Sequence, residues 1–281
     1  MAYGIANSYG RPSFEEICGM LDLAFSNGVR TIDTARTYGE SEELIGKALF
    51  EINLPFRIIS KLSPDVCVGS TLSKESISKV EVSLHESLQY LQLERIDTLL
   101  LHRGFQRTCH NGEIWEYLKT QKRNGLIGKI GISAVTPIEA IDALEDGSVD
   151  VIQVATSILD QRLFKQGFFE KARERGVEVH VRSIFLQGLA FLNETSIPKN
   201  LEFAIPQLRK ITDFARVKDV APELIWLSFA KRLEASHLVI GSESINQLQM
   251  NLRAFQDSFD TEEITKLIEV LPDYILDPSK W

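Results

Sequence analysis

Hydrophobic positions along the chain change spacing regularly from residue 14 onward. Stretches with helical spacing alternate with short runs rich in β-branched residues, a pattern typical of repeated βα units around a parallel sheet. The runs predict seven strands, at residues 29–33, 57–61, 96–101, 129–133, 149–154, 177–182 and 237–241. The helical stretches cover residues 14–27, 41–50, 74–93, 113–124, 137–146, 167–175, 201–218 and 222–233, and a further helix is expected at 244–256.

Glycines and prolines mark the boundaries of these elements. Gly28, Gly125 and Gly176 each follow a helical stretch and precede a strand, where a left-handed residue ends a helix at little cost. Pro137 and Pro222 stand where helices should begin, and a proline at the first helical position loses no hydrogen bond. No linker-like segment or internal repeat divides the chain. We therefore expect a single domain over residues 1–281.

The charge balance argues against several classes of partner. The chain has 31 Lys and Arg against 39 Asp and Glu, for a net charge of −8. It has no basic run that would bind nucleic acid. Its apolar runs fall far short of the ~20 residues of a membrane helix, and its N-terminus lacks the pattern of a signal peptide. We expect a cytoplasmic protein without a nucleic-acid or membrane partner; the sequence leaves its oligomeric state open.

Cysteine and histidine spacing gives no indication of a metal site. Cys18, Cys67 and Cys109 are odd in number and widely spaced, so they are interpreted as reduced thiols and not as a disulfide framework or thiolate ligands. The five histidines form no His-Glu-x-x-His or similar ligand pattern. No metal is expected.

Polar side chains stand where three of the predicted strands end. Asp33 ends the first strand and is followed by Tyr38, Lys61 ends the second, and His102 follows the third. Each alone has an ordinary alternative, such as a turn-forming Asp or a Lys that extends its charge to solvent. In a βα barrel, however, catalytic groups lie at the C-terminal ends of strands. We expect these four side chains to meet there.

Together the four residues are suited to proton transfer. A phenol titrates near pH ~10, and a neighbouring ammonium favours its phenolate. Lys61 is expected to act in this way on Tyr38, with Asp33 holding the ammonium and His102 donating a hydrogen bond to a substrate oxygen. This arrangement would protonate a developing alkoxide. It lacks a hydride source, which must be a cofactor.

The segment that carries Asp33 and Tyr38 resembles the signature of the aldo-keto reductases. It reads G-V-R-T-I-D-T-A-R-T-Y-G-E-S-E over residues 28–42, with Ile45 and Gly46 after it. Lys61 and His102 fall where that family has its Lys and His, and similar segments continue through Asn251. The resemblance implies an α/β fold, the TIM (β/α)8 barrel, and a nicotinamide cofactor, usually NADPH, bound without a Rossmann domain. The chain indeed has no Gly-x-Gly-x-x-Gly.

The resemblance also implies a role for individual residues. Tyr38 would be the general acid, Lys61 and Asp33 its tuning pair, and His102 the residue that orients the carbonyl. The implied cofactor-binding positions run from the nicotinamide to the adenosine end: Ser133 and Gln153 at the carboxamide, Arg182 at the ring, Ser183, Leu186, Gln187 and Gly188 along the pyrophosphate, and Gly241, Ser242, Gln247 and Asn251 at the adenosine.

Two of these positions depart from the family pattern. Arg182 stands where many members have an aromatic residue, and it is expected either to stack on the nicotinamide or to pair with a local carboxylate. Gly241 and Gln247 replace a Lys and an Arg around the 2′-phosphate, and Glu243 adds a negative charge nearby. Backbone amides and Ser242 at the start of the 244–256 helix could still bind phosphate. NADPH is the first expectation and NADH stays open.

A third departure concerns the N-terminus. Only thirteen residues precede Phe14, and residues 3–7 resemble the loop that follows the family's first strand. The first strand of the barrel is therefore expected to be missing, which would leave two exposed sheet edges. Either the chain begins at an internal methionine of a longer product, which we favour, or another segment fills the gap. In either case, no strand is expected within residues 1–13.

The leading hypothesis is an NAD(P)H-dependent oxidoreductase that reduces an aldehyde or ketone to an alcohol. The alternatives are a non-catalytic regulatory protein that binds the cofactor, and an isomerase or lyase on the same barrel. Arg103, Gln106 and Arg107 follow His102 and are expected to line the pocket of a polar, sugar-like or acidic ligand, or else to be solvated surface.

Overall fold

The structure, a computed structural model, describes residues 10–67, 73–277 and 280–281. These residues fall into two units. The first comprises Pro12–Gln153 and Arg175–Glu178, and the second comprises 10–11, Val154–Glu174 and the described part of Val179–Trp281.

Parallel strands form the centre of the first unit. They are β1 (Thr31–Asp33), β2 (Arg57–Lys61), β3 (Ile96–Leu101), β4 (Ile127–Ser133) and β5 (Val151–Ala155), and each pairs in parallel with the next along the chain. The register sets Lys61 beside Leu100 and Ser133 beside Gln153. The C-terminal ends of these strands therefore lie along one edge of the sheet.

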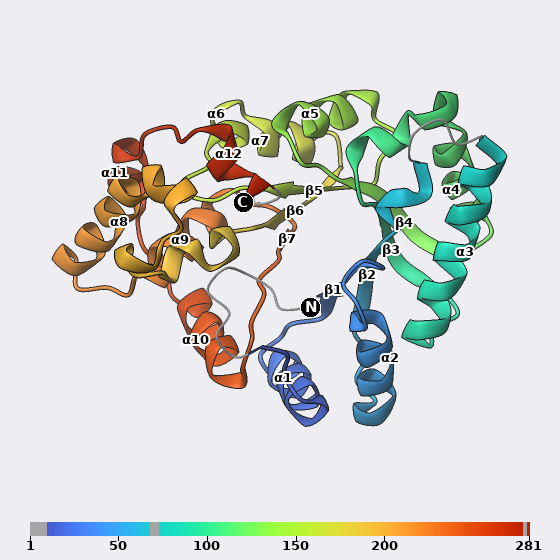
Figure 1. Ribbon diagram of the computed structural model, residues 1–281, viewed down its shortest axis with the longest axis horizontal. Coiled ribbons are helices and arrows are strands. Elements are labelled where there is room, and N and C mark those ends of the chain that lie inside the picture. The colour runs from blue at the N-terminus through green and yellow to red at the C-terminus, as the bar shows by residue number, and fades with distance from the viewer. Residues whose placement is uncertain (1–9, 68–72, 278–279) are drawn as a thin grey trace. The chain divides into compact units, whose positions relative to one another are not determined.

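One helix precedes these strands and others connect them, as Figure 1 shows for the first unit. They are α1 (Phe14–Ser26), α2 (Ser41–Ile52), α3 (Ser73–Leu91), α4 (Glu113–Arg123) and α5 (Pro137–Asp146). Neighbouring helices from α1 to α4 pack on one another. The N-termini of α1 and α5 each have a capping box: Ser13 accepts from the Glu16 amide, and Thr136, just before Pro137, accepts from the Glu139 amide.

The second unit holds β6 (Glu178–Arg182) from Val179 onward, together with β7 (His237–Leu238). His180 and Val181 pair in parallel with His237 and Leu238. Its helices are α6 (Arg162–Lys165), α7 (Phe168–Glu174), α8 (Ile205–Val217), α9 (Pro222–Arg232), α10 (Ile245–Gln256), α11 (Glu262–Leu267) and α12 (Asp273–Leu276). No helix among the described residues has the length and apolar character needed to cross a bilayer.

Strand side chains supply the core of the first unit. Ile58, Leu99, Leu101, Val151 and Ile152 are fully buried. Such burial on successive positions means that both faces of the sheet are covered, as in parallel sheets generally. This explains why the strands appear in the sequence as nearly continuous apolar runs.

The seven predicted strands are confirmed, with ends shifted by up to three residues. Gly28, Gly125 and Gly176 adopt the predicted left-handed conformation, with φ of 86°, 86° and 68°. The helix predicted at 201–218 is shorter, because Pro206 lies in the first turn of α8 and the preceding Lys199–Ala204 is a 3-10 helix. The short helices α6, α11 and α12 were not predicted.

The prediction for residues 1–13 falls mostly outside the described residues, which begin at Gly10. Residues 10–13 hold no strand.

The prediction that all three cysteines are reduced thiols is wrong for two of them. Cys67, in the loop after β2, and Cys109, in the loop after β3, form a disulfide with their Cα atoms 6.7 Å apart. These cysteines are 42 residues apart in sequence. They meet because β2 and β3 are neighbours whose following loops emerge from the same edge of the sheet. Cys18 is free.

Gly46 of α2 lies against the backbone of α3. A Cβ atom at this position would lie 2.2 Å from the carbonyl oxygen of Tyr90 and 2.9 Å from the backbone of Leu91. We expect Gly46→Ala to lower the free energy of unfolding by about 3 kcal/mol, because two helix backbones must separate to admit the methyl group. Urea denaturation measures the change. Lys47→Ala, on the exposed side of the same helix, is the control and should change stability by less than about 0.5 kcal/mol.

Candidate active site

A buried ion pair lies at the C-terminal ends of β1 and β2. The Lys61 ammonium donates to the Asp33 carboxylate and to the carbonyl oxygen of Thr34, the latter at 2.9 Å. The Lys61 side chain is 1% exposed. A charge so deeply buried costs several kcal/mol unless it is paired. The folded protein therefore needs the Asp33 carboxylate to stabilise the Lys61 ammonium.

Tyr38 and His102 lie next to this pair. The Lys61 Nζ is 5.0 Å from the centroid of the Tyr38 ring. The ring centroids of Tyr38 and His102 are 6.1 Å apart, with their planes at 88°. The Thr37 hydroxyl is 3.5 Å from His102 Nδ1. The four residues predicted from strand ends are thus brought together within the first unit.

The loop that carries Tyr38 is fixed to the sheet by Arg36. The backbone amide of Arg36 donates to the carbonyl of Lys61 at 3.1 Å, and the Arg36 guanidinium donates to Glu42 at 2.7 Å. Glu42 is 1% exposed and also accepts from the Ser60 hydroxyl at 2.5 Å. The sequence prediction missed this network, although Arg36 and Glu42 both lie within the segment that resembles the family signature.

Ser133 and Gln153, expected at the nicotinamide carboxamide, lie side by side on β4 and β5. The Ser133 hydroxyl is 3.5 Å from Gln153 Oε1, a long and weak hydrogen bond. Gln153 Nε2 donates to the second carboxylate oxygen of Asp33 at 2.7 Å, and Gln153 is fully buried. Gln153 therefore helps to hold Asp33, a contact that the sequence did not indicate.

The residues expected along the pyrophosphate belong to the second unit and form a strained loop after β6. Ser183, Leu186 and Gln187 have φ of 59°, 46° and 52°, and Gly188 has 91°. Non-glycine residues rarely adopt this left-handed conformation, and runs of it occur preferentially at functional sites. Arg182, just before them, donates from Nη1 to the Ser183 hydroxyl at 3.2 Å.

The residues expected at the adenosine end surround the start of α10, also in the second unit. Ser244 caps this helix by accepting from the amide of Gln247. The Gln247 side chain accepts from the Glu243 amide at 2.6 Å, and Asn251 donates to the Ser242 hydroxyl at 3.1 Å. These bonds order the turn that begins at Gly241. The N-terminus of a helix favours anions. Burial raises the pKa of the Glu243 carboxyl above its ordinary value.

The loop after His102 differs from its predicted role at Gln106. This side chain is fully buried, donates to the carbonyls of Ser63 and Pro64, and accepts from the Arg103 amide. Gln106 thus ties the loop after β3 to the loop after β2 and does not line a ligand pocket. Arg107 forms an ion pair with Asp146 at the C-terminal end of α5.

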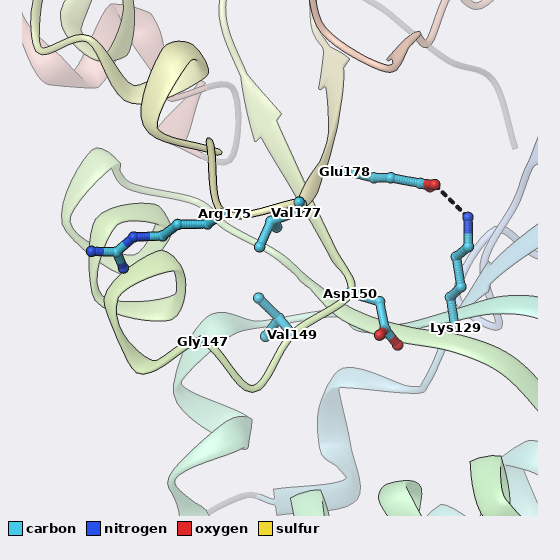
Figure 2. A pocket seen from close by; sticks show the side chains of 8 residues that line it. Lys129, Gly147, Val149, Asp150, Arg175, Val177 and Glu178 are labelled. Atoms are coloured by element: carbon cyan, nitrogen blue, oxygen red, sulfur yellow. Dashed lines mark hydrogen bonds and ion pairs between the residues drawn. The ribbon is translucent and has the colours of Figure 1, made fainter. Parts of the chain in front are cut away.

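A cavity of about 530 Å³ opens at the other end of the strands of the first unit (Figure 2). It is lined by Lys129, Gly147, Val149, Asp150, Arg175, Gly176, Val177 and Glu178. Lys129 pairs with Glu178 across it, and Asp150 pairs with Lys122 at 2.6 Å. Because barrel enzymes place their chemistry at the opposite ends of the strands, this cavity is separate from the candidate active site.

Comparisons with known proteins identify the family. The sequence profile described as the Aldo/keto reductase family matches residues 1–272, so the chain belongs to this family and is an oxidoreductase of the aldo-keto reductase type. The resemblance predicted from the sequence is thereby confirmed.

Two curated relatives and one solved structure cover most of the chain. The uncharacterized oxidoreductase YrpG of Bacillus subtilis is 25% identical over 90% of this chain and 86% of its own. The L-galactose dehydrogenase of Arabidopsis thaliana is 24% identical over 98% of this chain and 89% of its own. The holo form of aldo-keto reductase AKR11C1 from Bacillus halodurans superposes with a TM-score of 0.76 at 22% identity, covering 92% and 89% of the two chains. The fold is therefore that of the aldo-keto reductase (β/α)8 barrels.

The Lys61–Asp33 pair can be tested by removing one partner and then both. Asp33→Asn leaves a buried ammonium without its carboxylate, and we expect it to lower the free energy of unfolding by about 3–5 kcal/mol. Adding Lys61→Met removes the unpaired charge and should recover most of the free energy of unfolding that Asp33→Asn loses. Urea denaturation measures both variants. Glu194→Gln, which breaks the exposed pair with Arg209, is the control and should leave the midpoint nearly unchanged; equal stability of the single and double variants would contradict the expectation.

Proposed function

We propose that the chain reduces an aldehyde or ketone to an alcohol with NADPH, using Tyr38 as the general acid. The observation that carries this proposal is the buried Lys61–Asp33 pair with Tyr38 and His102 beside it. The Lys61 side chain is 1% exposed at the end of a strand. Next to a phenol and an imidazole it forms a proton-transfer site.

Each unit carries groups of the kind that bind part of a nicotinamide dinucleotide, which supports the proposal. Ser133 and Gln153 carry a hydroxyl and an amide, the kinds of group that hydrogen-bond a carboxamide; both are buried, and the Gln153 Nε2 is already bonded to Asp33. The left-handed loop from Ser183 to Gly188 and the capped start of α10 offer backbone amides to phosphate groups. When bound, the reduced nicotinamide supplies the hydride. Arg182 is proposed at the ring.

Proton transfer then falls to the first unit. The Tyr38 hydroxyl donates its proton to the carbonyl oxygen as negative charge develops there. The Lys61 ammonium, held by Asp33, favours the phenolate that remains. His102 directs the carbonyl by donating a hydrogen bond from its ring. Gln153 and the Thr34 carbonyl hold the pair in place, since each makes one further bond to it.

Removing the Tyr38 hydroxyl should separate catalysis from binding. We expect Tyr38→Phe to lower kcat for aldehyde reduction by about 10²–10⁴-fold, because the general acid is lost. NADPH affinity should stay unchanged. Loss of nicotinamide absorbance with an aldehyde panel and fluorescence titration of the cofactor measure the two effects.

Tyr117→Phe on α4 makes the same chemical change away from the site and is the control. A wild-type chain that binds NADPH without turnover would favour the non-catalytic alternative. A Tyr38→Phe variant as active as the wild type would refute the assignment of the acid.

The choice between NADPH and NADH should depend on Glu243. If the 2′-phosphate lies at the start of α10, Glu243→Gln removes a repulsion of about 1 kcal/mol and tightens NADPH binding by about fivefold. NADH lacks this phosphate, so its affinity should not change. Fluorescence titrations with both cofactors measure the effect. Glu223→Gln, at the start of α9, is the matched control. An equal change in the affinities for NADH and NADPH on Glu243→Gln would contradict the placement of the 2′-phosphate.

A further inference from the structure

The Cys67–Cys109 disulfide cross-links two loops that begin at the candidate active site. One loop follows Lys61 at the end of β2, and the other follows His102 beyond the end of β3. Other bonds hold the loops in place without it: the Leu62 amide of the first loop donates to the Leu100 carbonyl of β3 at 2.9 Å, and Gln106 of the second loop donates to the Ser63 and Pro64 carbonyls of the first. Opening of the disulfide therefore removes one link between the two loops but leaves these hydrogen bonds near the ends of β2 and β3 in place.

The two sulfur atoms differ in exposure. Cys67 is 7% exposed, whereas Cys109 is half-buried. Thiol exchange requires a thiolate to approach one sulfur in line with the bond to the other. The more exposed Cys109 is therefore the sulfur that an outside thiol reaches, and Cys67 is the leaving group.

Cys67 has a partner suited to a leaving thiolate. His110 Nε2 lies 3.7 Å from the Cys67 sulfur and 3.0 Å from the hydroxyl of Ser76, which is fully buried on α3. An imidazole in this position stabilises a thiolate by donating a hydrogen bond. A better-stabilised leaving thiolate departs faster.

The backbone that follows Cys109 is strained. His110 and Asn111 have φ of 49° and 54°, and Gly112 has 84°. Three consecutive left-handed residues, two of them not glycine, are uncommon and persist where the surroundings hold them. In this chain they turn the His110 ring toward Cys67. Labile and regulatory disulfides are typically the exposed or strained ones.

We propose that the Cys67–Cys109 disulfide is a thiol-exchange site, at which a low-molecular-weight thiol forms a mixed disulfide with Cys109. The incoming thiolate bonds to the Cys109 sulfur, the bond between the two cysteines breaks, and its electron pair stays on Cys67 as a thiolate beside His110. A second small thiol then attacks the mixed disulfide and releases the oxidised small disulfide and the Cys109 thiol. Two small thiols are oxidised and one protein disulfide is reduced, so the electrons balance.

The first experiment locates the adduct. The full chain in a Cys18→Ser background is treated with reduced glutathione, quenched with N-ethylmaleimide and mapped by peptide mass spectrometry. Glutathione is expected on Cys109 and maleimide on Cys67. Glutathione mainly on Cys67, or no exchange on the folded chain, overturns the proposal. The background removes the remaining thiol, whose pKa is raised by burial and by Glu51.

The second experiment tests the leaving-group partner. His110→Asn should slow the release of Cys67 by about tenfold, because the thiolate loses its donor. His85→Asn, an exposed histidine on α3 that contacts the Glu81 carbonyl, is the matched control and should leave the rate unchanged. An unchanged rate in His110→Asn overturns the role of His110. Circular dichroism of both variants verifies that they fold.

Serine variants give an independent readout. With oxidised glutathione, Cys67→Ser should accumulate a stable mixed disulfide at Cys109, whereas Cys109→Ser should react at Cys67 at least severalfold more slowly. The reverse order contradicts the assignment. All of these readouts are masses and rates of thiol exchange, so they succeed or fail independently of carbonyl reduction.

Discussion

A lysine ammonium that is 1% exposed needs an opposite charge in direct contact, and in this chain Asp33 supplies it. That contact exists because β1 and β2 run parallel as neighbours, in a register that sets Asp33 opposite Ile59 and so close to Lys61, two residues further along β2. The same register brings Tyr38 over the ammonium and leaves His102, one strand further, facing the phenol ring. The chemistry of the first unit therefore depends on strand pairing more than on any single loop.

The strands and the four strand-end residues were predictable because each depends on local information. A run of β-branched residues marks a strand, and adjacent parallel strands bring their ends to one edge. The bond between Gln153 and Asp33 was not predictable, since it joins residues 120 positions apart and depends on register. The disulfide was missed for a similar reason: cysteine counting carries no information about which loops emerge side by side. The shorter α8, by contrast, could have been predicted from Pro206.

In the loops after β2 and β3, a polar residue that was expected to contact a ligand has a structural role instead. Gln106 looked like a ligand contact because it follows His102, yet both polar atoms of its side chain bond to backbone groups of these two loops. Buried amides of this kind donate hydrogen bonds to carbonyl groups that would otherwise have no hydrogen-bond partner in a packed loop. Exposure and partner atoms, which a sequence does not contain, distinguish such a residue from one that contacts substrate.

Arg36 joins the sheet through its backbone and the buried Glu42 through its side chain, only two residues before Tyr38. The loop that carries Tyr38 is therefore anchored to the sheet and to α2. In evolutionary terms, changes in the loops after β2 and β3 would leave these anchoring contacts of the Tyr38 loop intact. In engineering terms, foreign loops grafted at these positions would leave Tyr38, the proposed proton donor, in its place.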